Sequence, residues 1–113
     1  MANYTNLLQK FGLSPTAAKV YLALLELGQG SADKIAKRAN TYKANTYDAI
    51  DKLEELGLST YIYEGNKKQF IPTNPEKLPQ ILENMKKKEL GKMEEMKKDI
   101  TELMPQLKAK YGS

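Results

Sequence analysis

The residues best suited to chemistry in this sequence are polar and basic side chains at the start of a periodic segment, residues 43–56. Lys43 and Asn45 lie in its first turn. An asparagine amide pairs with an adenine edge and lysine donates to guanine, so both types suit contacts with base pairs in a major groove. The alternative is a polar helix start in which asparagine only caps. Tyr42 and Tyr47 would contact phosphate or sugar, or else pack half-buried.

Two further groups of side chains have the chemistry of phosphate binding. Asn66, Lys67 and Lys68 lie at the tip of a predicted hairpin, where little packing competes for them. Ser31 precedes a predicted helix whose free N–H groups suit an anion. That helix also has cations that would attract phosphates or simply form a solvated face: Lys34, Lys37 and Arg38.

The composition argues against an enzyme and against a bound metal or cofactor. The chain has no cysteine and no histidine, which removes disulfides, most transition-metal sites and the commonest general base. None of its seven glycines forms a dinucleotide-binding or Walker-type loop. We therefore expect no catalytic residue, no metal site and no cofactor.

The charge permits nucleic-acid binding without requiring it. The net charge is +4, but residues 31–72 contain seven basic and six acidic side chains, and no segment is a basic block. The N-terminus has no signal pattern, and no apolar run approaches the roughly 20 residues that cross a bilayer. We expect a soluble, cytoplasmic, nucleoid-associated protein with no membrane partner.

Three helices are predicted before residue 58. Residues 14–28 begin with a serine cap and a proline, and residues 31–39 form a shorter helix that begins at Ser31. Residues 43–56 place Thr46, Ile50 and Leu53 on one buried side, and the helix ends at a glycine. Two acids of that helix point away from the core, on the side that would meet DNA: Asp48 and Asp51.

A hairpin and a long helix are predicted next. Residues 58–63 and 67–71 are β-rich and flank a glycine-asparagine turn, and Pro72 stops the second strand. From residue 75 helical spacing runs almost to the end. Gly91 weakens this helix, and Pro105 should kink or end it near residues 101–104.

The long helix has an apolar seam that requires a partner. From Met93 the apolar residues are spaced by three and four, as in a heptad repeat: Met93, Met96, Ile100, Leu103 and Leu107. The seam would fold back on the first helix or pair with a second copy of the chain, and we favour the second copy. Its methionines suit an adaptable interface. The surrounding lysines, such as Lys86 to Lys88, are better explained as a solvated lysine-glutamate surface.

This order of elements predicts a mainly α fold with a small β-hairpin, namely a winged helix-turn-helix followed by a long C-terminal helix. We assign residues 1–74 to the DNA-binding domain and residues 75–113 to a dimerisation helix. In this plan the third helix, residues 43–56, enters the major groove, and the wing at residues 64–68 contacts phosphates or the minor groove.

The sequence also resembles a known family, the TrmB-like archaeal transcriptional regulators. The similar stretches are FGLS at 11–14, AKVYLALL at 18–25, SADKIA at 31–36 and YDAIDKLEELGL at 47–58. The resemblance covers about residues 7–75 and implies a winged helix whose recognition helix exits through a glycine-leucine pair into the wing. Larger members have a sugar-binding effector domain. This chain is too short for one, so we do not expect a small-molecule effector.

The leading hypothesis is a homodimeric transcriptional regulator that binds double-stranded DNA. Family members often have an arginine or lysine together with serine before the recognition helix, whereas residues 41–46 contain one cation, Lys43. Two alternatives stay open. The domain would be a protein-interaction module, for which the balanced charge of residues 31–72 is the best argument, or a nonspecific chromatin-type DNA-binding protein.

Overall fold

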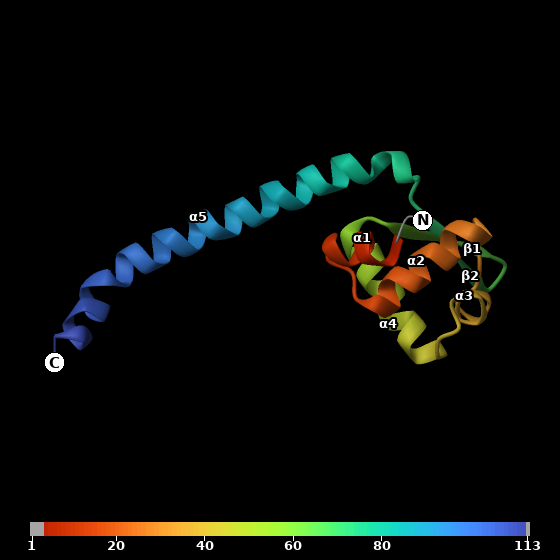
Figure 1. Cartoon of the computed structure of the whole chain (residues 1–113), viewed down its shortest axis with the longest axis horizontal. Helices are drawn as coiled ribbons and strands as arrows, with labels where there is room; N and C mark the ends of the chain where they lie inside the picture. Colours follow the sequence, from red (N-terminus) through yellow and green to blue (C-terminus); the bar gives the residue numbers. More distant parts are fainter. Residues whose placement is uncertain (1–3, 113) are drawn as a thin grey trace. The chain divides into compact units, whose positions relative to one another are not determined.

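The computed structural model describes residues 4–112, and the chain divides into two compact units, residues 1–78 and 79–113. The first unit contains four helices and a two-stranded antiparallel sheet (Figure 1). The second unit is one helix. The elements, in chain order, are α1 (Tyr4–Lys10), α2 (Pro15–Leu27), α3 (Ala32–Ala39), α4 (Lys43–Leu56), β1 (Ser59–Glu64), β2 (Lys67–Pro72), the 3-10 turn η1 (Pro75–Lys77) and α5 (Leu78–Tyr111).

Helices α2, α3 and α4 form the core and confirm the predicted helices. Tyr21, Leu24, Ile35, Ile50 and Leu53 are almost fully buried where these three helices meet. The hydroxyl of the residue before α2 accepts the predicted capping bond, which Ala17 N–H donates over 3.0 Å. The core therefore rests on one apolar face from each helix, as the periodicity indicated.

The turn between α3 and α4 depends on Asn40, which adopts a left-handed conformation with φ 55°. Its N–H donates to the end of α3, and its short polar side chain suits this conformation better than most others would. The turn fixes the direction in which α4 starts, and so the orientation of its first turn.

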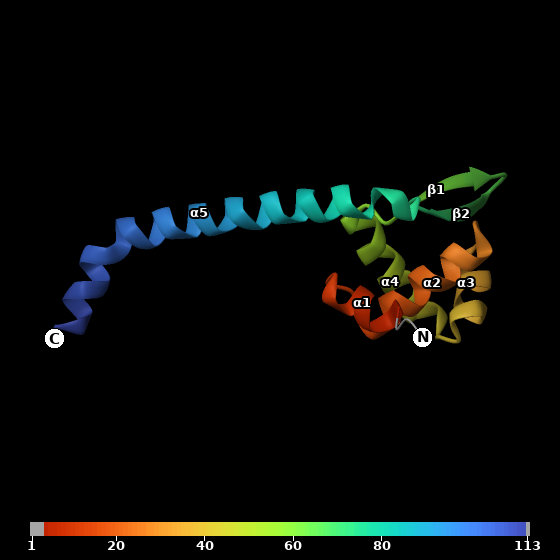
Figure 2. The ribbon, with the colours of Figure 1, turned by 45° about the horizontal axis from the view of Figure 1, so that its top comes forward.

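The hairpin is attached to the helices at its base. Ser59 pairs with Pro72 and Glu64 with Lys67, which leaves a two-residue turn that begins at Gly65 with φ 64°. Gly30, between α2 and α3, exchanges both backbone hydrogen bonds with Phe70 of β2, at 3.0 and 2.8 Å. Figure 2 shows the turn of the hairpin projecting beyond the helices. The wing is thus held through Gly30 and, next to its turn, by a hydrogen bond that Gln29 Nε2 donates to Glu64 Oε1 over 2.8 Å.

Helix α1 was not predicted. It has seven residues, and Leu8 is its one buried side chain, where the helix lies against α2. A helix with a single buried residue has too little apolar periodicity to be recognised in a sequence.

Helix α5 runs for 34 residues and passes through both predicted weak points. Gly91 does not interrupt it, and it continues beyond Pro105 to Tyr111 instead of ending near residues 101–104. Figures 1 and 2 show its axis bending in the last turns, as expected where proline removes a backbone donor. No residue of α5 is buried in the single chain. Within residues 4–112, no helix is both long and apolar enough to cross a membrane.

Candidate nucleic-acid interface

The first turn of α4 presents polar side chains to solvent. Lys43 and Asn45 are exposed, and Tyr42, at the position before the helix, is 82% exposed. Thr46 is the residue that bonds back, since its hydroxyl donates to the Tyr42 carbonyl over 3.0 Å. Among the described residues Asn45 has no capping hydrogen bond, so the capping explanation of this asparagine loses its support. Its amide is free to bind an external partner.

Lys43 reaches toward the start of α3 instead of straight outward. Its Nζ lies 3.0 Å from Oδ1 of Asp33. The hydrogen bond to Asp33 and the charge of that carboxylate, with a smaller contribution from Tyr47, raise the pKa of Lys43 above its ordinary value. Lys43 is therefore cationic at neutral pH, and the carboxylate of Asp33 partly offsets its positive charge.

The predicted phosphate-binding residues of α3 have different environments. The Nε of Arg38 donates to Oε2 of Glu26 over 2.8 Å, and a second guanidinium nitrogen contacts the same oxygen, so Arg38 faces α2. The Ser31 hydroxyl caps α3 by accepting from the Lys34 N–H over 3.3 Å. Lys34 and Lys37 are exposed and form no ion pair with a described residue. Of the three cations, these two lysines are the ones free to bind phosphate.

A hollow of about 240 Å³ joins the wing to the start of α3 and to α4, and we call it the wing groove. Its lining residues are Ser31, Ala32, Asp33, Tyr47, Lys67, Lys68 and Phe70. Ser31, Asp33 and Tyr47 contribute polar side chains to this lining, and the wing contributes Lys67, Lys68 and Phe70. The groove brings the predicted wing residues next to the flank of α4.

Lys68 is held in place by an aromatic ring that the sequence analysis did not single out. Its Nζ lies 3.9 Å from the centroid of Tyr61, which in turn makes an edge contact with Phe70. The ammonium over the ring is a cation–π contact. Tyr61 and Lys68 lie on the same face of the hairpin, because Lys68 pairs with Tyr63 and residues two apart on a strand share a face. Lys67 has no such contact and is fully available at the tip.

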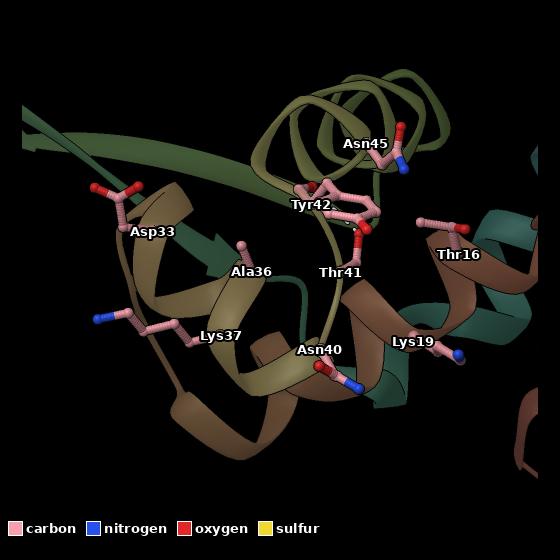
Figure 3. A pocket seen from close by; sticks show the side chains of 9 residues that line it. All are labelled: Thr16, Lys19, Asp33, Ala36, Lys37, Asn40, Thr41, Tyr42 and Asn45. Carbon is pink, nitrogen blue, oxygen red and sulfur yellow. Dashed lines mark hydrogen bonds between the residues drawn. The ribbon is translucent and has the colours of Figure 1, made fainter.

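A second and larger hollow, of about 800 Å³, lies on the other flank of the first turn of α4, and we call it the α2 hollow (Figure 3). Its lining comes from the start of α2, from α3, from the α3–α4 turn and from the first turn of α4: Thr16, Lys19, Asp33, Ala36, Lys37, Asn40, Thr41, Tyr42 and Asn45. Neither Thr16 nor Lys19 was predicted to be a site residue. Both lie in the predicted first helix, whose polar side could not be placed near α4 without the tertiary structure.

The rest of the outer face of α4 is mostly acidic. Asp48, Asp51 and Glu55 are exposed along it, as predicted for the first two, and Lys52 is an exposed cation among them. Three acids against one lysine leave this part of the helix with net negative charge. The first turn is therefore the part of α4 best suited to contact a polyanion.

Within residues 4–112, no group of three or more acidic side chains is placed to hold a metal ion. The start of α4 therefore lies between two hollows. Lysines line both of them, and the charged wing forms part of the wing groove.

Comparison with known proteins identifies the family. A model described as "Sugar-specific transcriptional regulator TrmB" matches residues 8–76. The chain belongs to the TrmB family. It is 31% identical over 96 residues to the HTH-type sugar sensing transcriptional regulator TrmBL1 of Pyrococcus furiosus, a match that covers 85% of this chain. The chain spans 27% of the length of that relative.

Solved structures support a winged-helix fold for this TrmB-family chain. TrmBL2, described as an archaeal chromatin protein with a novel mode of DNA binding, superposes with a TM-score of 0.72 at 22% identity, over 94% of this chain and 44% of its own. A MarR family transcriptional regulator from Silicibacter pomeroyi gives a TM-score of 0.57 at 18% identity, over 94% of this chain and 78% of its own. The resemblance stated from the sequence is thereby confirmed, as is the fold class.

Proposed function

We propose that this TrmB-family chain is a transcriptional regulator that binds double-stranded DNA as a homodimer. In this proposal the first turn of α4 enters the major groove, and Lys43 and Asn45 contact base edges. The wing binds phosphates or the minor groove through Asn66, Lys67 and Lys68. DNA binding would associate the chain with the nucleoid in the cytoplasm.

The observation that supports this proposal best is the arrangement around the wing groove. Tyr47 of α4 and two wing lysines line one hollow, and the exposed Lys43 and Asn45 lie just before Tyr47 on the same helix. A duplex offers the matching pattern, with base edges in the groove and phosphates along its rim. The family's description as sugar-specific transcriptional regulators agrees with this use.

Dimerisation is proposed through α5. The five seam residues, Met93, Met96, Ile100, Leu103 and Leu107, are each between 46% and 54% exposed in the single chain. Helix α5 spans about 50 Å at 1.5 Å per residue, and the seam takes up about 21 Å of it, or two heptads. Ile100 and Leu103 occupy an a and a d position of the heptad, a pairing that favours two strands. Two winged domains on such a dimer would bind half-sites about one helical turn apart.

A triple substitution tests the assignment of the base-contacting and wing residues. The full chain with Lys43→Ala, Lys67→Ala and Lys68→Ala should lose the mobility shift that the unmodified chain gives with duplex DNA. Intact binding by the triple variant would refute these sites. A matched variant with Lys86→Ala, Lys87→Ala and Lys88→Ala on α5 removes the same charge and should still bind.

The acidic outer face of α4 favours a second candidate, a winged-helix module that binds a protein through Asp48, Asp51 and Glu55. A salt titration separates the two, because phosphate contacts make affinity fall steeply with salt.

Mobility shifts with random duplex and with the DNA upstream of the protein's own gene, each at two salt concentrations, separate a specific regulator from a chromatin-type protein. Equal affinity for both duplexes would favour the chromatin-type function.

A further inference from the structure

The α2 hollow has polar chemistry on nearly every side. Ala36 is its one purely apolar lining residue, while hydroxyls and amides come from several elements: Thr16, Thr41, Tyr42, Asn40 and Asn45. Small-molecule sites are mostly apolar with a few polar groups, so this hollow does not have the lining of an effector pocket. Its lining suits a hydrated, charged ligand.

Two lysines lie at opposite rims of this hollow. Lys19 comes from α2 and Lys37 from α3, and Figure 3 shows them on either side of Asn40. Both are exposed, and neither forms an ion pair with a described residue. Asp33 is the one acid in the lining, and Lys43 already bonds to it at 3.0 Å. The free charge at the rim is therefore positive.

The α2 hollow and the wing groove flank the same turn of α4. Asn45 lines the first and Tyr47 the second, and residues two apart on a helix point about 160° from each other. A helix start that lies in the major groove has one phosphate backbone on each side of it, since the groove is only about 12 Å wide. The wing lysines account for one backbone.

We propose that the α2 hollow binds the phosphodiester backbone of the second DNA strand, with Lys19 and Lys37 as the cations and Thr16 as a hydroxyl donor. This inference rests on the proposed function and adds to it a contact surface from α2. The duplex is then held on both rims of the major groove, and the acidic outer turns of α4 stay clear of the phosphates.

The test measures affinity for a labelled random-sequence duplex over a salt series, with the full chain. Lys19→Gln should reduce affinity several-fold at low salt and reduce the slope of log affinity against log salt by roughly 0.9, the value of one lost phosphate contact. Thr16→Lys should increase the slope by a similar amount. A gain of this kind cannot result from misfolding. The matched control is Lys77→Gln, an exposed lysine of η1 that should change neither quantity.

The outcomes distinguish this inference from the proposed function. Unchanged slopes in both Lys19→Gln and Thr16→Lys, with a steep slope in the unmodified chain, overturn the second backbone contact and leave DNA binding intact. A loss of affinity in Lys19→Gln with an unchanged slope also overturns it, because the residue would then act without touching phosphate. A flat slope in the unmodified chain overturns the proposed function itself.

Discussion

Lys43 at the start of α4 and Asp33 at the start of α3 form an ion pair, with 3.0 Å between Nζ and Oδ1. Both side chains are more than half exposed, so the pair is in contact with solvent. Asp33 lines the wing groove and the α2 hollow alike. One carboxylate thus lies between the two surfaces proposed to bind phosphate and holds the only cation in the first turn of α4.

Asp33→Asn should strengthen DNA binding. The substitution releases Lys43 and removes a negative charge near the phosphates, and an exposed pair of this kind contributes little in water, so we expect a gain in affinity of about a few-fold. Fluorescence anisotropy with a labelled duplex at fixed salt measures it. The measurement should be made well below the unfolding temperature, because Asp33 also stabilises the start of α3.

Glu94→Gln on α5 provides the control for Asp33→Asn, since it removes one exposed negative charge elsewhere and should gain little. Weaker binding by Asp33→Asn would mean that the ion pair orients Lys43 toward the DNA. That result would contradict the expectation that Asp33 holds Lys43 back from the DNA.

The two wing lysines should respond differently to alanine. Lys67→Ala removes a free cation, so it should lower the salt slope by about one and leave thermal stability unchanged. Lys68→Ala should lower the slope and also destabilise the hairpin by roughly 0.5–1 kcal/mol, because its ammonium lies 3.9 Å from the Tyr61 ring. Parallel anisotropy titrations and thermal melts separate the two effects. Equal stability of both variants would argue that the ring contact contributes nothing.

Tyr21→Phe should stabilise the first unit by about 1 kcal/mol. The Tyr21 side chain is 1% exposed, and its hydroxyl has no hydrogen-bond partner among the described residues, so removing the oxygen relieves a buried unsatisfied group. Chemical denaturation at neutral pH measures the change. A loss of 1 kcal/mol or more would show that the hydroxyl has a partner.

Tyr21 also predicts a pH dependence. Burial raises the pKa of its phenol above the ordinary 10.0. Below pH 10.0 the phenol is protonated in both the folded and the unfolded chain, so it has no effect on the pH dependence there. As the pH rises above that value, the unfolded chain ionises first and the folded state loses stability until its own phenol ionises. The unfolding free energies of the unmodified chain and of Tyr21→Phe should therefore diverge above pH 10, and that of Tyr21→Phe should fall less. Parallel curves would contradict the raised pKa.

Ile100→Asp should convert a dimer into a monomer, because it places a charge in the middle of the seam. Lys98→Asp introduces the same side chain on the opposite face of α5 and should leave the dimer intact. Sedimentation equilibrium of the full chain gives the masses. A dimer that persists in Ile100→Asp, or an unmodified chain that is monomeric, would rule out the α5 interface.

Most of the fold could be predicted because its signals are local. The serine caps before α2 and α3, the glycines that end α2 and α4, and the glycine-asparagine turn each fix a boundary through backbone chemistry. The apolar face of α4 follows from spacing alone. Helix α1 escaped prediction because one buried leucine is no pattern, and Pro105 was overestimated as a terminator because a helix can bend around one missing donor.

The site could be predicted only in part, since its contacts join residues that are distant in sequence. Lys43 and Lys67 were identified from the types of residue and their place in the motif. The partners of Lys43 and Arg38, which are Asp33 and Glu26, depend on how α2, α3 and α4 pack against one another. The place of Lys19 in the lining of the α2 hollow could not be predicted for the same reason.

The central claim is that this chain binds duplex DNA through phosphate contacts on both flanks of α4. Its most direct test is the affinity of the unmodified full chain for a labelled duplex across a salt series. We expect log affinity to fall linearly with log salt, with a slope of about −3.6 or steeper, since at least four lysines would neutralise phosphates. A slope near zero, or no binding at low salt, would contradict it.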